Sequence, residues 1–316
     1  MLTNNELTCW YKRVFLNSFD WFVIRNIMIE ESELIVNDDG SIFHLHLKPG
    51  ELADTVLLVG DPGRVEMISS KLDETELKVS NREFVSVTGR YRGHRLSVVS
   101  TGIGTDNIDI VVNELDALVN IDLEKREILP GHRSLRLVRI GTSGGLQRDL
   151  PVGSWVVSHK SVGFDGMLSY YAGRDSVSDL AFEEAFRTFT GWPVSFPSPY
   201  VVDASPRLLA KFSGPEFARG VNISAPGFYG PQGRELRLPL ALPHLNEQLE
   251  AFSFEGYKIT NYEMESSAIY GLSALLGHEA LTVCLLIANR MTRGANESYH
   301  GSMERLVEAV LNHLIR

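Results

Sequence analysis

The chain has 316 residues, 44% of them hydrophobic and 22% charged, a composition typical of globular proteins and a length that suits one large domain or two small ones. Its formal net charge of −10 argues against nucleic-acid binding, because such binding needs a basic face that neutralises phosphates. Its two cysteines, Cys9 and Cys284, argue against a disulfide framework and favour a cytoplasmic location, and no apolar stretch approaches the roughly 20 residues of a membrane helix.

The first 27 residues are aromatic and basic, and Met28 then opens an acidic stretch. Asp20 interrupts their apolar part and no small-residue cleavage site follows, which argues against a signal peptide. We expect residues 1–40 to form an N-terminal extension, with Met28 as the natural start and residues 1–27 outside the fold. Residues 41–316 contain no repeat and no Pro/Ser-rich linker, so they are expected to form a single domain.

Strand and helix patterns alternate along this domain. Residues 55–60 read as a buried strand, followed by a Pro-Gly turn and a helix that begins near Arg64. Residues 84–88 and 95–101 read as a hairpin joined through residues 89–93, and residues 106–120 as a helix with Asp106 as its cap. Further strands are expected over 135–140, 155–158 and 281–288, and further helices over 264–276 and 302–315. This alternation predicts an α/β domain with ligands at the strand ends.

The run Arg139-Ile-Gly-Thr-Ser-Gly-Gly follows an apolar segment and has the character of an anion site. Glycines at the end of a strand would expose backbone N–H groups, Thr142 adds a hydroxyl and Arg139 a planar fork that suits phosphate oxygens. The run matches neither the P-loop nor the dinucleotide pattern. The alternative interpretation of this run is an ordinary strand-to-helix turn with a surface arginine.

Two further strand ends repeat this composition. Gly60-Asp-Pro-Gly-Arg64 combines a tight turn with an arginine in the first helical turn, and Thr101-Gly-Ile-Gly-Thr105 is again rich in glycine. An ordinary turn around Pro62 and close backbone packing are the alternatives. Together the three runs favour one pocket for an anion.

The run Phe228-Tyr-Gly-Pro-Gln-Gly-Arg234 would suit a flat heterocycle, because Phe228 could stack on its face while Gln232 offers a donor and an acceptor to an imide edge. In Asn261-Tyr-Glu-Met-Glu-Ser266, Glu263 and Glu265 could accept the paired hydroxyls of a ribose. The alternatives are a polar surface loop for the first run and acidic residues that complement a helix dipole for the second.

His44 and His46 would share one side of a strand and so raise the question of a metal ion. No third ligand stands at an obvious spacing, and histidines often serve as hydrogen-bonding groups instead. We therefore expect no metal site.

The chain resembles the nucleoside phosphorylases, and within them the uridine phosphorylase branch. The matching segments are Phe43-His-Leu, Gly60-Asp-Pro-Gly-Arg-Val, Asn81-Arg-Glu-Phe, Ser100-Thr-Gly-Ile-Gly, Arg139-Ile-Gly-Thr, Phe228-Tyr-Gly-Pro-Gln-Gly-Arg, Asn261-Tyr-Glu-Met-Glu-Ser and Asn289-Arg290. The resemblance implies a three-layer α/β/α fold with a central mixed, partly barrel-like sheet. It also implies phosphorolysis of a nucleoside in pyrimidine salvage, with uridine and phosphate giving uracil and ribose 1-phosphate.

The resemblance also assigns roles to single residues. Phosphate would be held by Gly60, Arg64, Arg139, Thr142 and a neighbouring subunit's Arg82. The ribose would be held by Met264, Glu265 and a neighbouring subunit's His44. The base would be held by Phe228, Gln232 and Arg234, and the groups nearest the departing base would be Arg234, Gln232 and Arg290.

The family implies a homo-oligomer whose sites are shared across a dimer interface, with inorganic phosphate as co-substrate and no other cofactor. Related purine enzymes carry a Ser-Asp pair where this chain has Ala288-Asn289-Arg290, which favours a pyrimidine. Residues 121–134 and 200–220 are longer than usual, so the choice between dimer and hexamer stays open. Asn107 replaces a small residue beside the family's monovalent-cation site, which leaves that ion open too. Phosphorolysis of another nucleoside, a nucleosidase and a non-catalytic binding or storage protein are the alternatives.

Overall fold

The computed structural model describes residues 28–296 and 298–315, so the prediction about residues 1–27 lies outside it. Residues just after Met28 contact the main body of the protein. The backbone N–H of Ile29 donates to the carbonyl of Arg126, and Leu34 and Val36 pack against the hydrophobic core.

One half of the main sheet is built around β1 (Thr55–Val59), which pairs in parallel with β4 (His94–Ser100) on one side and β7 (Arg136–Gly145) on the other. Beyond β4 follow β3 (Phe84–Tyr91) and the edge strand β2 (Glu74–Asn81), both antiparallel. Parallel pairing brings the carboxyl ends of β1 and β4 to the same edge of the sheet, where ligands are expected to bind.

The other half of the sheet closes on itself. Strand β7 pairs with β13 (Glu279–Asn289), which pairs with β8 (Trp155–Gly163), then β10 (Phe217–Ser224), then β12 (Tyr257–Glu263), and β12 returns to β7. This five-stranded ring confirms the mixed, partly barrel-like sheet that the resemblance implied. Short strands extend it: β9 (Tyr200–Asp203), β11 (Ser253–Phe254) and β14 (Gly294–Ala295). A separate hairpin joins β5 (Ile121–Asp122) to β6 (Glu127–Ile128).

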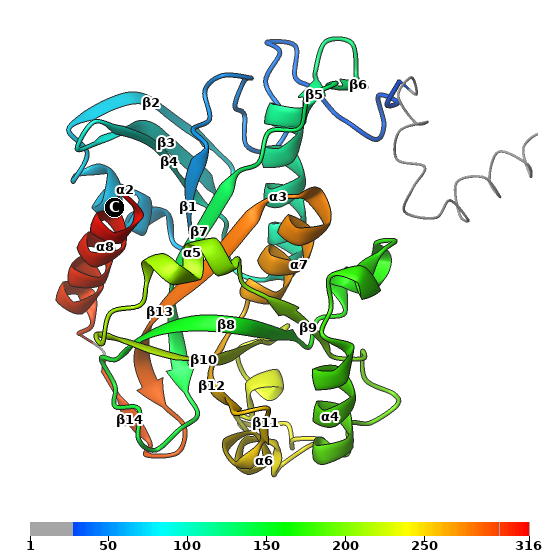
Figure 1. Ribbon diagram of the computed structural model, residues 1–316, viewed down its shortest axis with the longest axis vertical. Coiled ribbons are helices and arrows are strands. Elements are labelled where there is room, and N and C mark those ends of the chain that lie inside the picture. Colours follow the sequence, from blue (N-terminus) through cyan, green and yellow to red (C-terminus); the bar gives the residue numbers. More distant parts are fainter. Residues whose placement is uncertain (1–27, 297, 316) are drawn as a thin grey trace, which may run out of the picture.

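Helices cover both faces of the first half of the sheet. In Figure 1, α2 (Pro62–Ser69) and α8 (His300–Leu314) lie on one side of β1, β7 and β13, and α3 (Thr105–Asn120) and α7 (Ser266–Leu276) lie on the other. The remaining helices are α4 (Leu180–Thr190), α5 (Pro206–Lys211) and α6 (Leu245–Ala251). None of the helices in the described part of the chain combines the length and the hydropathy needed to cross a bilayer.

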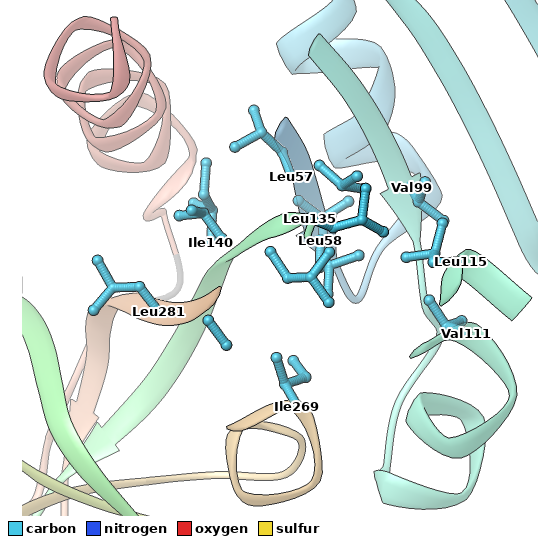
Figure 2. Packing of buried hydrophobic residues seen from close by; sticks show 14 of the residues in the cluster. Leu57, Leu58, Val99, Val111, Leu115, Leu135, Ile140, Ile269 and Leu281 are labelled. Carbon is cyan, nitrogen blue, oxygen red and sulfur yellow. The ribbon is translucent and has the colours of Figure 1, made fainter. Parts of the chain in front are cut away.

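The core fills the space between these layers. Figure 2 shows Leu57 of β1, Ile140 of β7, Leu281 of β13, Ile269 of α7 and Val111 of α3, which belong to one hydrophobic cluster. All five side chains are fully buried, which fixes the strands that carry the site against the helices behind them.

The largest error in the predicted elements concerns residues 141–145. The sequence placed a strand end at Ile140 and a glycine turn after it, whereas β7 continues to Gly145 and spans 10 residues. Glycine is a poor strand former, but β13 and β12 pair with this stretch from either side and supply its hydrogen bonds. Arg139 and Thr142 therefore project from the middle of a strand.

Other predictions of local structure were also wrong. Strand β8 continues to Gly163 instead of ending at Ser158. Helix α3 begins at Thr105 after Gly104, without a side-chain cap, so Asp106 lies inside its first turn. Helix α7 begins at Ser266, so Met264 precedes it. His44 lies in a turn instead of a strand, and His46 follows it with a positive φ of 55°.

Candidate active site

The candidate site is a cavity of about 640 Å³ at the strand ends where β1, β12 and β13 meet the middle of β7. Its lining includes these residues from the predicted site: Gly60, Arg64, Phe228, Arg139, Thr142, Gln232, Arg234, Met264 and Glu265. Residues that the sequence did not single out also line it, among them Ile103, Tyr262, Asn296 and Tyr299. Ile103 and Tyr262 lie inside two of the quoted motifs but had no role assigned to them, whereas Asn296 and Tyr299 belong to no recognised motif and reach this wall only through the fold.

The cationic end of the cavity begins at the turn after β1. Asp61 caps α2 by accepting a hydrogen bond from the Gly63 N–H at 2.9 Å, which sets the helix start at Pro62. Arg64 then lies in the first turn of α2 and is almost fully buried, and its Nη1 donates to the carbonyl of Ile140 at 3.1 Å. Burial and the nearby Arg139 lower the pKa of this guanidinium. Its positive charge is therefore poorly compensated, and a bound anion would stabilise it.

Arg139 lies beside Arg64 and between two carboxylates. Its Nη2 donates to Oε2 of Glu265, its Nη1 lies 3.3 Å from Oε2 of Glu263, and the same Nη1 lies 3.4 Å from Sγ of Cys284. Burial alone would lower the pKa of Arg139, but the carboxylates of Glu265 and Glu263 outweigh it and raise that pKa. The guanidinium is therefore permanently charged and held at several atoms.

Glu263 and Glu265 come from the end of β12 and the residue before α7. Glu263 accepts hydrogen bonds from the backbone N–H groups of Glu265 and Ser266, at 2.9 Å and 3.0 Å, and from the hydroxyl of Ser224. Glu265 accepts from the Gly104 N–H at 2.9 Å. Burial raises the pKa of Glu265, and the attraction of Arg139 acts against that rise. Both residues contribute to the cavity lining, but the side chain of Glu263 is fully buried and its carboxylate is occupied by these donors and by Arg139.

The opposite end of the cavity is formed by the loop around the short 3₁₀ helix Gly230–Gln232. Oε1 of Gln232 accepts from Nη1 of Arg234 at 2.9 Å and from Nη2 of Arg290 at 3.1 Å. The guanidinium of Arg234 lies 3.5 Å from the ring centre of Phe228, whose carbonyl also accepts from Nη1. Arg290 thus stands behind Gln232 and does not line the cavity.

This end also lacks a neutralising carboxylate among the described residues in contact with its arginines. Burial and the proximity of Arg290 lower the pKa of Arg234 to about 10. Burial lowers the pKa of Arg290 as well. Because arginine keeps its proton in proteins, both guanidinium groups are positively charged, and an anion bound nearby would be stabilised by them.

His44 and Arg82 lie together but do not line this cavity. Nδ1 of His44 lies 2.6 Å from Oε1 of Glu114, and the side chain of Asn81 donates to the His44 carbonyl at 2.8 Å. Arg82 is exposed, with a φ of 53°, and its guanidinium lies 5.4 Å from the ring centre of Phe43. The two residues form a common patch outside the lining of their own chain's cavity.

Asn289, in the place of the purine enzymes' acid, is turned away from the cavity. Its Nδ2 donates to the carbonyls of Gln147 and Leu150, each at 2.8 Å, and its Oδ1 accepts from the Met291 and Thr292 N–H groups. Ala288, not Asn289, lines the cavity. This position is therefore structural.

One group of metal-ligand type occurs among the described residues, away from the cavity lining: Asp116, His132 and His278. Nδ1 of His278 accepts a hydrogen bond from the Leu135 N–H at 3.2 Å, so in the neutral ring the proton is on Nε2. That nitrogen lies 3.1 Å from Asp116 and has no lone pair to give to a metal. The group fits a link between α3 and the start of β13 better than a metal site.

Comparison with known proteins identifies the family of the chain. Residues 54–316 match the family model described as the Phosphorylase superfamily. The chain belongs to the phosphorylase superfamily. This confirms the family resemblance drawn from the sequence motifs.

Among its relatives in this superfamily, the uridine phosphorylase of Thermococcus kodakarensis is 30% identical over 263 residues, which is 81% of this chain and 80% of that protein. The uridine phosphorylase of Haemophilus influenzae is 30% identical over 79% of this chain and 86% of its own. A solved structure of a Trypanosoma brucei nucleoside phosphorylase, described as showing uridine phosphorylase activity, superposes with a TM-score of 0.81 at 28% identity. It covers 89% of this chain and 99% of its own.

Proposed function

We propose that the protein is a pentosyltransferase that cleaves a nucleoside with inorganic phosphate, converting uridine to uracil and ribose 1-phosphate. The observation that carries this proposal is that two clusters of side chains line one cavity. Arg64 and Arg139 belong to one cluster together with Glu263 and Glu265, and Gln232 with Arg234 forms the other. We assign the first cluster to phosphate and ribose and the second to the base of a nucleoside attacked at C1′. The two uridine phosphorylase relatives support the choice of uridine.

The reaction follows from these positions. The bond between C1′ and the base nitrogen breaks, its electron pair leaves with the uracil, and the ribose gains oxocarbenium character. A phosphate oxygen then forms the new bond to C1′ from the opposite face. Arg64 and Arg139 would position this nucleophile, which is a proximity effect. Donors preorganised around the leaving uracil would stabilise its negative charge, a role that suits Arg234 and the amide of Gln232.

Arg290 would affect the leaving base in two ways, by holding Gln232 and by its positive charge. Its hydrogen bond to Oε1 helps to fix the amide, so that Nε2 of Gln232 remains the donor for a base carbonyl. Side chains and the two substrates supply every group that these steps need, so the proposal includes inorganic phosphate as co-substrate and no further cofactor.

The charge at the phosphate end supports a site shared between subunits. The positive charges of Arg64 and Arg139 are offset there by the carboxylates of Glu263 and Glu265. A dianionic phosphate would therefore meet little net positive charge within the described part of one chain. An exposed Arg82 from a neighbouring subunit would supply the missing cation, and His44 of the same patch would reach the ribose 5′-hydroxyl. The protein would then be an obligate homo-oligomer.

The base preference follows from what the base end lacks. Asn289 has its amide committed to the backbone and cannot act as a proton donor to a purine. The charge that develops on a uracil would instead be met by fixed positive donors, for which a proton transfer is unnecessary.

A panel of nucleosides tests the proposal by measuring base release with and without phosphate. We expect rapid uracil release from uridine only when phosphate is present, with little release from inosine. Release of base in phosphate-free buffer would point to a nucleosidase. A purine as the best substrate would point to another phosphorylase, and no release from any nucleoside would point to a binding or storage protein.

A further inference from the structure

The guanidinium of Arg139 lies directly over the backbone of Gly141. Residues two apart on a strand project from the same face, so the side chain of Arg139 passes over position 141 as it folds along β7. A Cβ at Gly141 would stand 2.6 Å from Cζ of Arg139 and 2.9 Å from Nη2, and closer still to Nη1. Real Cβ atoms do not approach heavy atoms this closely. The guanidinium thus occupies the volume that any other residue's Cβ would need.

The backbone itself does not require a glycine at this position. Gly141 is absent from the residues with positive φ, and its strand pairs regularly with Cys284 of β13. The three atoms nearest to the hypothetical Cβ all belong to the guanidinium of Arg139. The closest contacts that require a glycine at position 141 therefore come from Arg139.

The guanidinium cannot easily move aside to admit a side chain. Its nitrogens are held by Glu265 and Glu263 on β12 and the residues after it, and by Cys284 on β13. All of these groups are buried, so a displaced guanidinium would leave carboxylates unpaired away from water. Moving Arg139 by even one ångström would break charge-assisted hydrogen bonds.

We propose that Gly141 is a positioning residue for the phosphate nucleophile. Because it has no side chain, the guanidinium of Arg139 can lie against the backbone at position 141, in the orientation in which it binds the anion. This inference rests on the proposed function only for the identity of the anion. Gly141 acts through Arg139. Glu263 and Glu265 hold the same guanidinium through their ion pairs with it.

A double-mutant cycle between Arg139 and Gly141 tests this role, with inorganic phosphate as the ligand in titration calorimetry. Gly141→Ala is expected to weaken phosphate binding by at least about tenfold, the cost of losing one good charge-assisted contact. In an Arg139→Lys background there is no guanidinium to displace, so adding Gly141→Ala should change phosphate affinity by less than about twofold. Gly301→Ala, at an open position on α8, is the control for handling of the variants.

Kinetics separate this role from a general structural one. At saturating uridine, Gly141→Ala should raise the KM for phosphate more than it lowers kcat. If Gly141→Ala alone fails to fold, the proposal requires that the Arg139→Lys/Gly141→Ala double variant folds. Equal losses in both backgrounds, misfolding in both, or normal phosphate affinity of Gly141→Ala would each overturn it. Calorimetry needs no turnover, so a wild-type protein that binds phosphate but does not cleave uridine would refute only the proposed function.

Discussion

Replacing Arg234 with alanine should reduce turnover far more than it reduces phosphate affinity. Its guanidinium donates to Oε1 of Gln232 at 2.9 Å and lies 3.5 Å from the ring centre of Phe228. Loss of a preorganised donor to developing charge costs ~3 kcal/mol, or roughly a hundredfold in kcat. Loss of the contact with the Phe228 ring adds about 0.5–1 kcal/mol, which should appear as a few-fold higher KM for uridine.

The assay is steady-state uracil release, with phosphate affinity measured separately by calorimetry. The matched control is Arg234→Lys, which keeps the positive charge but loses the planar fork, and we expect an activity between wild type and Arg234→Ala. Phosphate affinity should stay within about twofold in both variants, because the hydrogen bonds of Arg234 all go to the base end. An Arg234→Ala protein with normal kcat and weak phosphate binding would refute the assignment of the two ends.

Three further predictions follow. Arg64→Ala and Arg82→Ala should each abolish activity. Mixed oligomers of the two variants, purified by two tags, should regain activity, because one site then receives Arg64 from one chain and Arg82 from the other. No recovery would argue against shared sites. Burial raises the pKa of Glu265 above 4.5, so its carboxylate protonates at a higher pH than usual, and uridine affinity measured without phosphate should fall as the pH drops through that pKa. The same titration with Glu265→Gln should be flat, and a pH dependence equal to that of wild type would contradict this reading. Asn289→Asp should lower the free energy of unfolding, measured in urea, by about 2–4 kcal/mol, because its carboxylate would face the carbonyls of Gln147 and Leu150. The same variant should not cleave inosine. A gain of purine activity would show that this position reaches the base.

The sequence was sufficient where burial and motif coincide. Strand β1 and most of β13 are continuous apolar runs, which are typical of strands buried on both faces. Residues such as Gly60 and Gln232 belong to short motifs with unusual side-chain combinations, and the fold brings these motifs into one cavity. The motifs, together with the family resemblance, could therefore point to residues that the fold brings together in one cavity.

The remaining features depend on contacts between distant segments. Strand β2 is an edge strand in which only Leu77 and Val79 alternate with polar residues, and two apolar residues are too few to predict a strand. The glycines of β7 read as a turn, and only their pairing with β12 and β13 makes them a strand. Glu263 appeared as one of two acidic residues in a helix, whereas it ends β12 and holds Arg139. Each of these outcomes is decided by a neighbour remote in sequence.

The central claim is that phosphate, and not water, attacks C1′. Phosphorus-31 NMR of the protein with uridine and inorganic phosphate tests it most directly, with uracil measured in the same sample. We predict that ribose 1-phosphate and uracil appear in equal amounts and that neither appears without phosphate. Uracil released with free ribose, or released at the same rate in phosphate-free buffer, would contradict the account.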